Sequence, residues 1–348
     1  MREFNYSKLK DKKWDNEILK LVAKIHEYKG RQELYLQQKP EELEKLVEIA
    51  KAQSIEASNE IEGIRTTNAR FNKLIHDKTT PRNRDEKEIL GYRDVLNTIH
   101  EYYEHIPLSS NYILQFHRDL LNYTDLDFGG KYKNVQNEIV AVDSDGNEVV
   151  LFRPLPPFET PAAIEAICES YNKVIAKEEI DPLILIPVFI HDFLCIHPFN
   201  DGNGRMSRLL TALLLYRSGY LVGRYISIEN KIAKNKDLYY DALQDCQEGW
   251  YENEEDTTAF IKYLLGVIIA SYRDFEDRVE LVSEKLPAIE MVRKAVNKQI
   301  GTFKKADIVE MCPSIGSSSV EASLKTLTES GEIEKLGSGR STCYVRKN

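Results

Sequence analysis

Residues 197–208 read His-Pro-Phe-Asn-Asp-Gly-Asn-Gly-Arg-Met-Ser-Arg and concentrate side chains that few folds need for stability. The unperturbed pKa of His197 is about 6.5, which suits a general base at neutral pH. The Asp201 carboxylate offers the hard oxygen ligands that Mg²⁺ prefers. Gly202 and Gly204 permit positive φ and let backbone N–H groups approach an anion. The combination predicts a site that handles a nucleotide triphosphate.

A helix is predicted to follow the two glycines, because apolar residues recur there at helical spacing. They are Met206, Leu209, Leu210, Leu213 and Leu214. The N-terminus of such a helix presents unpaired N–H groups to a phosphate. Arg205 and Arg208 lie three positions apart, so both project from one side of its first turns. Their guanidiniums are suited to grip outer phosphates by bidentate hydrogen bonds.

The most apolar stretch of the chain, residues 182–199, is predicted to be a buried helix that ends at this loop. Asp181 is its expected N-cap and Pro182 its first residue, while Pro187 would kink the helix or mark a restart. We interpret His191 as a structural histidine. The stretch is too short and too polar to span a membrane. With no signal peptide recognised at the start of the chain, a cytoplasmic protein is expected.

The pattern His-Pro-Phe-x-x-Gly-Asn-Gly-Arg-x-x-Arg resembles the signature of the Fic family, and residues 197–208 match it throughout. The resemblance implies a mostly α-helical enzyme with a small β-hairpin flap. Its activity would be protein adenylylation: AMP moves from ATP to a Ser, Thr or Tyr hydroxyl of a protein, and pyrophosphate leaves. The resemblance also implies His197 as the base and Asp201 as the ligand of Mg²⁺. The other implied nucleotide-binding residues are Gly202, Asn203 and Gly204 in an anion hole, and Arg205 and Arg208 as phosphate clamps.

A second motif lies far upstream, where Ser58-Asn59-Glu60-Ile61-Glu62-Gly63 fits the Ser/Thr-x-x-x-Glu-Gly/Asn pattern of inhibitory helices in Fic proteins. As plain chemistry the segment is a helix end with Gly63 at C′. The helix dipole disfavours Glu62 there by about 0.3–1 kcal/mol, and such local conflicts often mark functional positions. Because this motif lies N-terminal to residues 197–208, the resemblance is to class II Fic proteins. It implies that Glu62 pairs with Arg208 and inhibits transfer. It also implies that the same glutamate can help to remove AMP from targets.

A docking flap is expected between the two motifs. Residues 129–133, Gly-Gly-Lys-Tyr-Lys, resemble the Gly-x-Phe/Tyr-Arg element of the family, but Lys133 replaces the arginine, which leaves a bidentate contact there in question. Residues 138–142 and 148–152 are β-prone and flank an Asp-Gly turn at 143–147, which predicts a hairpin. The hairpin is either a plain surface feature or an edge that pairs with an extended target. The residues expected to face the target are Ile139, Val140, Val150 and Leu151.

An adenine pocket is expected downstream. Tyr239 and Tyr240 lie where related enzymes place a Tyr-Tyr pair against the base, and aromatic rings stack on any base. Gln247 and Trp250 follow on the same expected helix and would complete the pocket. Ordinary core packing is an equal alternative for these two residues.

Composition and patterning predict three regions. The 348 residues are 42% hydrophobic, enough for a sizeable core, and the net charge of −9 argues against a general coating of nucleic acid. Five scattered cysteines indicate a reducing compartment and neither zinc nor a disulfide framework. Residues 1–84 are expected to form an N-terminal helical region, with helices at about 14–37 and 40–62 and the inhibitory helix at about 52–63. Residues 85–275 are expected to form the Fic catalytic domain.

The remaining residues, 285–348, carry 11 Lys and Arg against 7 Asp and Glu. Their pattern resembles a winged helix-turn-helix, with helices at 286–299, 304–311 and 317–330 and strands at 332–336 and 342–345. The expected recognition helix lacks the Arg, Asn and Gln that read base edges. A module for target binding or for self-association, such as a homodimer, is therefore favoured over DNA binding.

Three alternatives to an adenylyltransferase remain. A Fic-like phosphotransferase would move another part of the nucleotide. A transcription regulator or binding protein would combine a winged helix with a weakly active Fic domain. A pure scaffold is the least supported, since it needs neither His197 nor Asp201.

Overall fold

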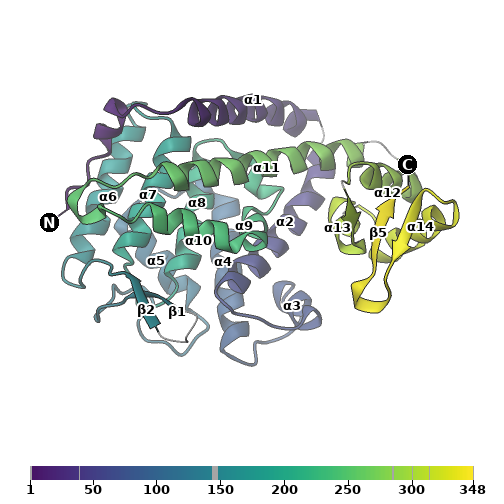
Figure 1. Ribbon diagram of the computed structural model, residues 1–348. Coiled ribbons are helices and arrows are strands. Elements are labelled where there is room, and N and C mark those ends of the chain that lie inside the picture. Colours follow the sequence, from purple (N-terminus) through teal and green to yellow (C-terminus); the bar gives the residue numbers. More distant parts are fainter. Residues whose placement is uncertain are drawn as a thin grey trace.

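The computed structural model describes residues 2–38, 40–142, 148–283, 286–299, 301–312 and 314–347, which are mostly helical (Figure 1). The α-helices are α1 (Asn16–Gln38), α2 (Pro40–Ile61), α3 (Asn68–Ile75), α4 (Arg84–Tyr102), α5 (Ser110–Leu120), α6 (Thr160–Ile175), α7 (Pro182–Ile196), α8 (Asn203–Arg217), α9 (Ile228–Lys234), α10 (Lys236–Asp245), α11 (Thr258–Ser283), α12 (Ala288–Asn297), α13 (Lys305–Met311) and α14 (Ser317–Glu329). The strands are β1 (Ile139–Val142), β2 (Glu148–Phe152), β3 (Thr302–Phe303), β4 (Ile333–Leu336) and β5 (Cys343–Arg346). Short 3₁₀ helices are η1 (Tyr6–Asp11), η2 (Tyr103–His105), η3 (Leu221–Arg224), η4 (Trp250–Glu252) and η5 (Gly339–Ser341).

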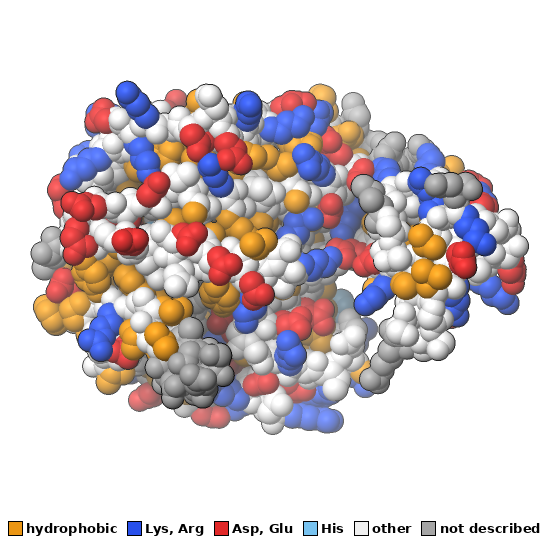
Figure 2. All heavy atoms as spheres, in the orientation of Figure 1, with side chains coloured by type: hydrophobic (Ala, Val, Ile, Leu, Met, Phe, Trp, Pro, Cys, Tyr) orange, Lys and Arg blue, Asp and Glu red, His pale blue; other side chains and the backbone are white. Residues whose placement is uncertain are grey.

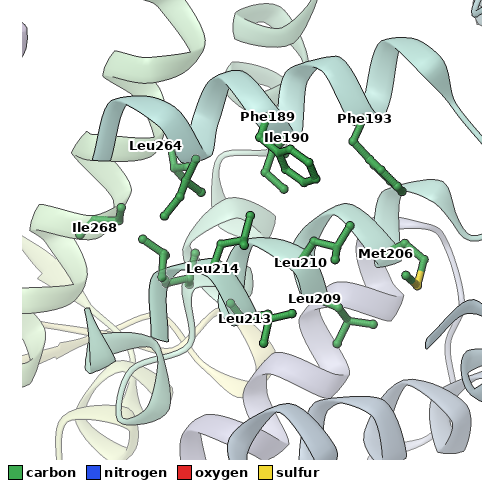
Figure 3. Packing of buried hydrophobic residues seen from close by; sticks show 14 of the residues in the cluster. Phe189, Ile190, Phe193, Met206, Leu209, Leu210, Leu213, Leu214, Leu264 and Ile268 are labelled. Atoms are coloured by element: carbon green, nitrogen blue, oxygen red, sulfur yellow. The ribbon is translucent and has the colours of Figure 1, made fainter. Parts of the chain in front are cut away.

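Helix α7 is the centre of the main body. Every side chain from Leu183 to Ile196 is buried. One face of α7 packs against the apolar stripe of α8. Leu264 and Ile268 of α11 belong to the same hydrophobic cluster (Figure 3). Burying a leucine or phenylalanine side chain contributes about 1.5–3 kcal/mol, so this layer is the main source of rigidity under the loop between α7 and α8.

The predictions for α7 are confirmed at its N-cap but not at Pro187. The Asp181 side chain accepts a hydrogen bond from the Leu183 N–H, as expected of an N-cap. The helix runs through Pro187 without a break, so the predicted restart is wrong. Pro187 is the sixth residue of α7, and a proline so early removes only one hydrogen bond while packing on both sides keeps the helix whole.

Helix α2, like α1, lies close to its predicted limits and packs along α4 and α9. A buried polar contact fixes it in place, because the Ser54 hydroxyl donates to Glu229 Oε2 at 2.7 Å. The C-terminal end of α2 reaches α8. The segment expected to inhibit thus lies against the helix that follows the reactive loop.

The hairpin formed by β1 and β2 is antiparallel, with Val140 opposite Val150. The predicted turn at residues 143–147 lies outside the described residues. Val140, Val149, Val150 and Leu151 are 39–45% exposed. Hydrophobic side chains gather at this corner of the surface, at the lower left in Figure 2.

The C-terminal segment has a hydrophobic cluster of its own, built from α12, α13, α14 and the strands. The sheet order is β3-β5-β4, all antiparallel. The predicted strands appear as β4 and β5, but β3 was missed because two residues are too few to show an alternating pattern. The winged-helix assignment stays a prediction. Glu310 of α13 joins this segment to the main body through ion pairs with Lys234 (2.9 Å) and Arg278 (3.1 Å).

Within the described parts of the chain, no helix combines the length and the apolar character needed to cross a membrane.

Candidate active site

A cavity of about 560 Å³ lies between the α7–α8 loop, the end of α2, helix α10 and the hairpin. Its size falls in the range typical of small-molecule sites. The predicted site residues that line it are Glu62, Ile139, Val140, Leu151, His197, Asp201, Gly202, Asn203, Gly204, Arg208, Tyr239, Tyr240 and Gln247. Residues up to 185 positions apart in sequence, from Glu62 to Gln247, therefore meet in one place.

His197 ends α7 in a left-handed conformation, with φ of 51°, while its N–H closes the helix on Phe193 O at 2.9 Å. Non-glycine residues seldom adopt this conformation, and they do so mainly at functional positions. Nδ1 lies 3.2 Å from Leu194 O, and because a carbonyl only accepts, Nδ1 carries the proton. Nε2 is left as an acceptor. Burial lowers the pKa of His197 to about 4, so the ring is unprotonated at neutral pH.

The loop after His197 is held by the side chain of Asn203, a residue that the resemblance places in the anion hole. The Asn203 amide donates to Phe199 O at 2.8 Å and accepts from the Phe199 N–H at 2.9 Å. The amide oxygen of Asn203 and one of its two amide N–H groups are therefore used within the loop. Gly202, with φ of 85°, precedes α8 as its N-cap, so the first N–H groups of α8 lack intrahelical partners.

Two further residues that support the loop were not recognised from sequence in that role. The Lys133 ammonium donates to Ile196 O at 2.9 Å, and the backbone N–H of Lys133 donates to Pro198 O at 2.8 Å. Lys133, in the position of the family's arginine, thus secures the end of α7, and burial lowers its pKa to about 8. His117 stacks on Phe199 with ring centroids 3.7 Å apart. No short motif marks either contact.

Asp201 belongs to a ring of four charges. Its Oδ2 accepts from Arg84 Nη2 at 2.7 Å, and its Oδ1 lies 3.5 Å from Arg205 Nη2. Glu88 joins the two arginines, with Oε1 2.5 Å from Arg84 Nε and Oε2 2.6 Å from Arg205 Nη1. The Arg205 side chain is only 1% exposed and is not part of the cavity wall, which differs from the expected phosphate clamp. Arg84 and Glu88 lie four positions apart on α4, a spacing that brings helical side chains together, but nothing in the sequence links either residue to Asp201.

Arg208 and Glu62 form the ion pair that the two motifs predict, with Nη2 2.7 Å from Oε1. Ser58 completes the contact, since its hydroxyl and its carbonyl accept from Arg208 at 2.8 and 2.9 Å. Burial opposes both charges, yet the pair holds the pKa of Glu62 below and that of Arg208 above the usual value. Gly204 makes the approach possible, because a Cβ there would lie 2.2 Å from Glu62 Oε1.

The end of α2 explains how Glu62 reaches the site. Gly63 has φ of 80°, and the Ile64 N–H bonds back to Asn59 O at 3.0 Å, which is the Schellman closure expected after a helix. The Lys236 ammonium also donates to Ile61 O at 2.6 Å and lines the cavity. Lys236 was not predicted, because a lone lysine at the start of a helix carries no motif.

The expected base pocket is present in part. Tyr239 is buried and Tyr240 is 42% exposed, with their rings 5.3 Å apart. Gln247 lines the cavity, but Trp250 does not, so the prediction that Trp250 completes the pocket is wrong. The Trp250 side chain is buried against the N-terminal segment, and its indole N–H donates to Asp192 Oδ1 at 2.7 Å. Core packing, the alternative reading, applies to this residue.

The hairpin forms one wall of the cavity. Ile139, Val140 and Leu151 line it, whereas Val150 stays outside and is 42% exposed. Among the described residues, no group of three or more His, Cys, Asp or Glu side chains could hold a metal alone. A metal at Asp201 would take its other ligands from phosphates and water, which is how Mg²⁺ usually binds with nucleotides.

Part of the chain is similar to known Fic proteins. Residues 107–215 match the model of the Fic/DOC family. A Fido domain-containing protein of Dictyostelium discoideum is 29% identical over 147 residues, covering 41% of this chain and 98% of that protein. The protein adenylyltransferase Fic of Drosophila yakuba is 27% identical over 184 residues, which are 52% of this chain but only 32% of the fly protein. A solved Fic family protein of Desulfovibrio desulfuricans shares the fold, with a TM-score of 0.65 at 20% identity, over 97% of this chain and 98% of the other.

Proposed function

The chain carries a Fic domain, and on that premise we propose that it is a protein adenylyltransferase that moves AMP from ATP to a Ser, Thr or Tyr hydroxyl of a protein. One observation carries the proposal. A single cavity unites His197 in its unprotonated form, the N-terminus of α8 and the Arg208 guanidinium. These are a base, a set of phosphate-binding N–H groups and a cation, which together suit attack of a hydroxyl on a phosphorus atom.

The order of events follows from the site. The target hydroxyl gives its proton to Nε2 of His197 as its oxygen attacks the α-phosphorus in line with the departing pyrophosphate. N–H groups at the start of α8 stabilise the charge that develops on the phosphate oxygens. Asp201 is the residue that would hold Mg²⁺, whose charge would offset that of the pyrophosphate. Arg208 Nη1 is buried and has no hydrogen-bond partner among the described residues, so it would gain one when the outer phosphates bind.

Glu62 would restrain this reaction. Its carboxylate occupies Arg208 Nη2 beside Gly204, where the terminal phosphate of ATP would otherwise bind. ATP therefore competes with a carboxylate that is already in place, and a pose fit for in-line attack is disfavoured. The same carboxylate would orient a water molecule that attacks the phosphorus of a modified target and releases AMP, which we include as a second, hydrolytic activity of the site.

The hairpin would dock the target. Its exposed apolar side chains stand at the cavity mouth, and its free edge offers backbone groups to an extended segment. Pairing of this kind depends on main-chain hydrogen bonds more than on side chains. A suitable target would therefore carry the hydroxyl on an extended, accessible loop.

Replacement of His197 tests the proposal. In full-length protein that also carries Glu62→Gly, His197→Ala should lower AMP transfer by about 10²–10⁴ while ATP binding persists, because the ring acts as a base and not as a phosphate ligand. Transfer is followed with ATP labelled in the α-phosphate. His105→Ala is the matched control, since His105 is exposed on η2. Transfer by His197→Ala at the rate of its parent would refute the mechanism.

A further inference from the structure

The two oxygens of the Asp201 carboxylate have different environments. Oδ1 accepts a hydrogen bond from the Gly202 N–H at 2.6 Å and lies beside Arg205, so it is held within its own loop. Oδ2 is bound by Arg84 Nη2 at 2.7 Å, and no other partner of this oxygen is present in the described part of the chain. The oxygen that is not held within the loop is therefore bound by a residue from another helix.

Arg84 is placed so that its guanidinium can release the Asp201 carboxylate. It is the first residue of α4, and its side chain is 59% exposed. Its Nε is 2.5 Å from Glu88 Oε1, so the guanidinium keeps one carboxylate when it releases the other. Arg84 itself lies outside the cavity wall that Asp201 lines.

We propose, on the basis of the function proposed above, that Arg84 is a displaceable counter-ion of Asp201. It covers Oδ2 in the nucleotide-free protein, and a divalent cation that arrives with ATP takes this oxygen and leaves the guanidinium to Glu88. Two cations at contact distance from one carboxylate oxygen repel each other, so the guanidinium and the divalent cation compete for Oδ2. Arg84 thereby sets the concentration of divalent cation that the site needs.

The expected effect is modest, because Arg84 and Asp201 form an exposed pair and such pairs are screened by solvent. Removal of the guanidinium should lower the Mg²⁺ concentration for half-saturation by about two- to fivefold. Arg82 offers a matched control of the same charge. It is exposed two positions upstream, and its side chain makes no hydrogen bond or ion pair in the region that the structure describes.

The experiment uses the full-length chain with Glu62→Gly, so that Arg208 is free to bind phosphate. The ligand is an ATP analogue with a methylene group between the α- and β-phosphates, which cannot transfer AMP. Binding of the analogue is titrated calorimetrically over a series of Mg²⁺ concentrations. Arg84→Gln and, as a second variant, Arg84→Ala should both shift half-saturation to lower Mg²⁺, with analogue affinity at saturating Mg²⁺ within about twofold. Arg82→Gln should leave both quantities unchanged.

The possible failures are distinct. An unchanged or higher half-saturating Mg²⁺ concentration in both Arg84 variants overturns the counter-ion proposal and leaves the adenylyltransferase in place. A loss of analogue affinity at saturating Mg²⁺ also overturns it, since Arg84 would then be a phosphate ligand. If the parent chain binds no analogue at any Mg²⁺ concentration, both proposals fall.

Discussion

Arg205 and Arg208 lie one turn apart on α8, but the residues around them differ. Both side chains are almost fully buried, at 1% and 3% exposure, and each pairs with a glutamate from another helix. Arg205 meets Glu88 in the first half of α4, and the Glu88 side chain is itself only 3% exposed. Arg208 meets Glu62 just past the end of α2, where the Glu62 side chain is 31% exposed and lines the cavity.

The difference lies in which partner can be replaced. Glu88 lies within α4 and also binds Arg84, and the buried Arg205 is held between Glu88 and Asp201. Glu62 sits in a turn at the cavity wall, so a phosphate can take its place on Arg208. Of the two arginines of this motif, Arg208 lines the cavity, where we propose that it binds phosphate, and Arg205 does not line it.

The largest expected difference is in stability. Glu88→Ala leaves the buried Arg205 with only its longer contact to Asp201, at 3.5 Å, and should lower the free energy of unfolding by about 3–5 kcal/mol. Glu62→Ala should cost less, about 1–3 kcal/mol, because Arg208 keeps both of its bonds to Ser58. Urea unfolding of the two full-length variants measures this. Equal losses would mean that both arginines are structural.

A smaller effect is expected from Gly204→Ala. The added Cβ would overlap Glu62 Oε1 at 2.2 Å and must push the carboxylate off Arg208. Overpacking of this size typically costs 1–3 kcal/mol, so AMP transfer should rise by roughly tenfold although Glu62 is still present. Gly266→Ala is the matched control, since it lies in α11 with open space around its Cα and gives the same gain in helix propensity. Equal labelling by wild type and Gly204→Ala would argue that Glu62 does not obstruct the site.

The smallest effect concerns pH. Burial lowers the pKa of His197 to about 4, and Glu62 acts in the opposite direction. The base is thus unprotonated at pH 7, and the transfer rate should fall only as the pH approaches 4. Removal of Glu62 should shift this acid limb to lower pH, whereas Glu88 is not among the groups that act on His197. Because the folded pKa lies below the unfolded one, the same histidine lowers stability as pH falls from about 6.5 toward 4.

The profile is measured as kcat/KM against pH for wild type, Glu62→Gly and Glu88→Ala. An acid limb with a midpoint near 6.5 in all three would show that His197 is solvated and free of these influences.

Much of this arrangement could be predicted from the sequence, since the motif at residues 197–208 and the helix end at Glu62 each carry a local pattern. The remainder depends on contacts between helices. The separation of Arg205 from Arg208 requires Glu88, which lies 117 positions before Arg205 and has no motif. Trp250 was assigned to the pocket because helical spacing gives a face but not what that face meets. Asn203 was placed in the anion hole by resemblance alone, and no pattern in the sequence shows that its side chain also hydrogen-bonds to the backbone of Phe199.

The central claim is that this site transfers AMP and that Glu62 restrains it. The most direct measurement is the intact mass of full-length wild type and of Glu62→Gly after incubation with ATP and Mg²⁺, followed by mass spectrometry of the modified peptide. The account predicts a gain of one or more AMP groups on hydroxyl side chains in Glu62→Gly, well above the level in wild type. A gain of phosphate alone, or equal masses for the two proteins, would contradict it.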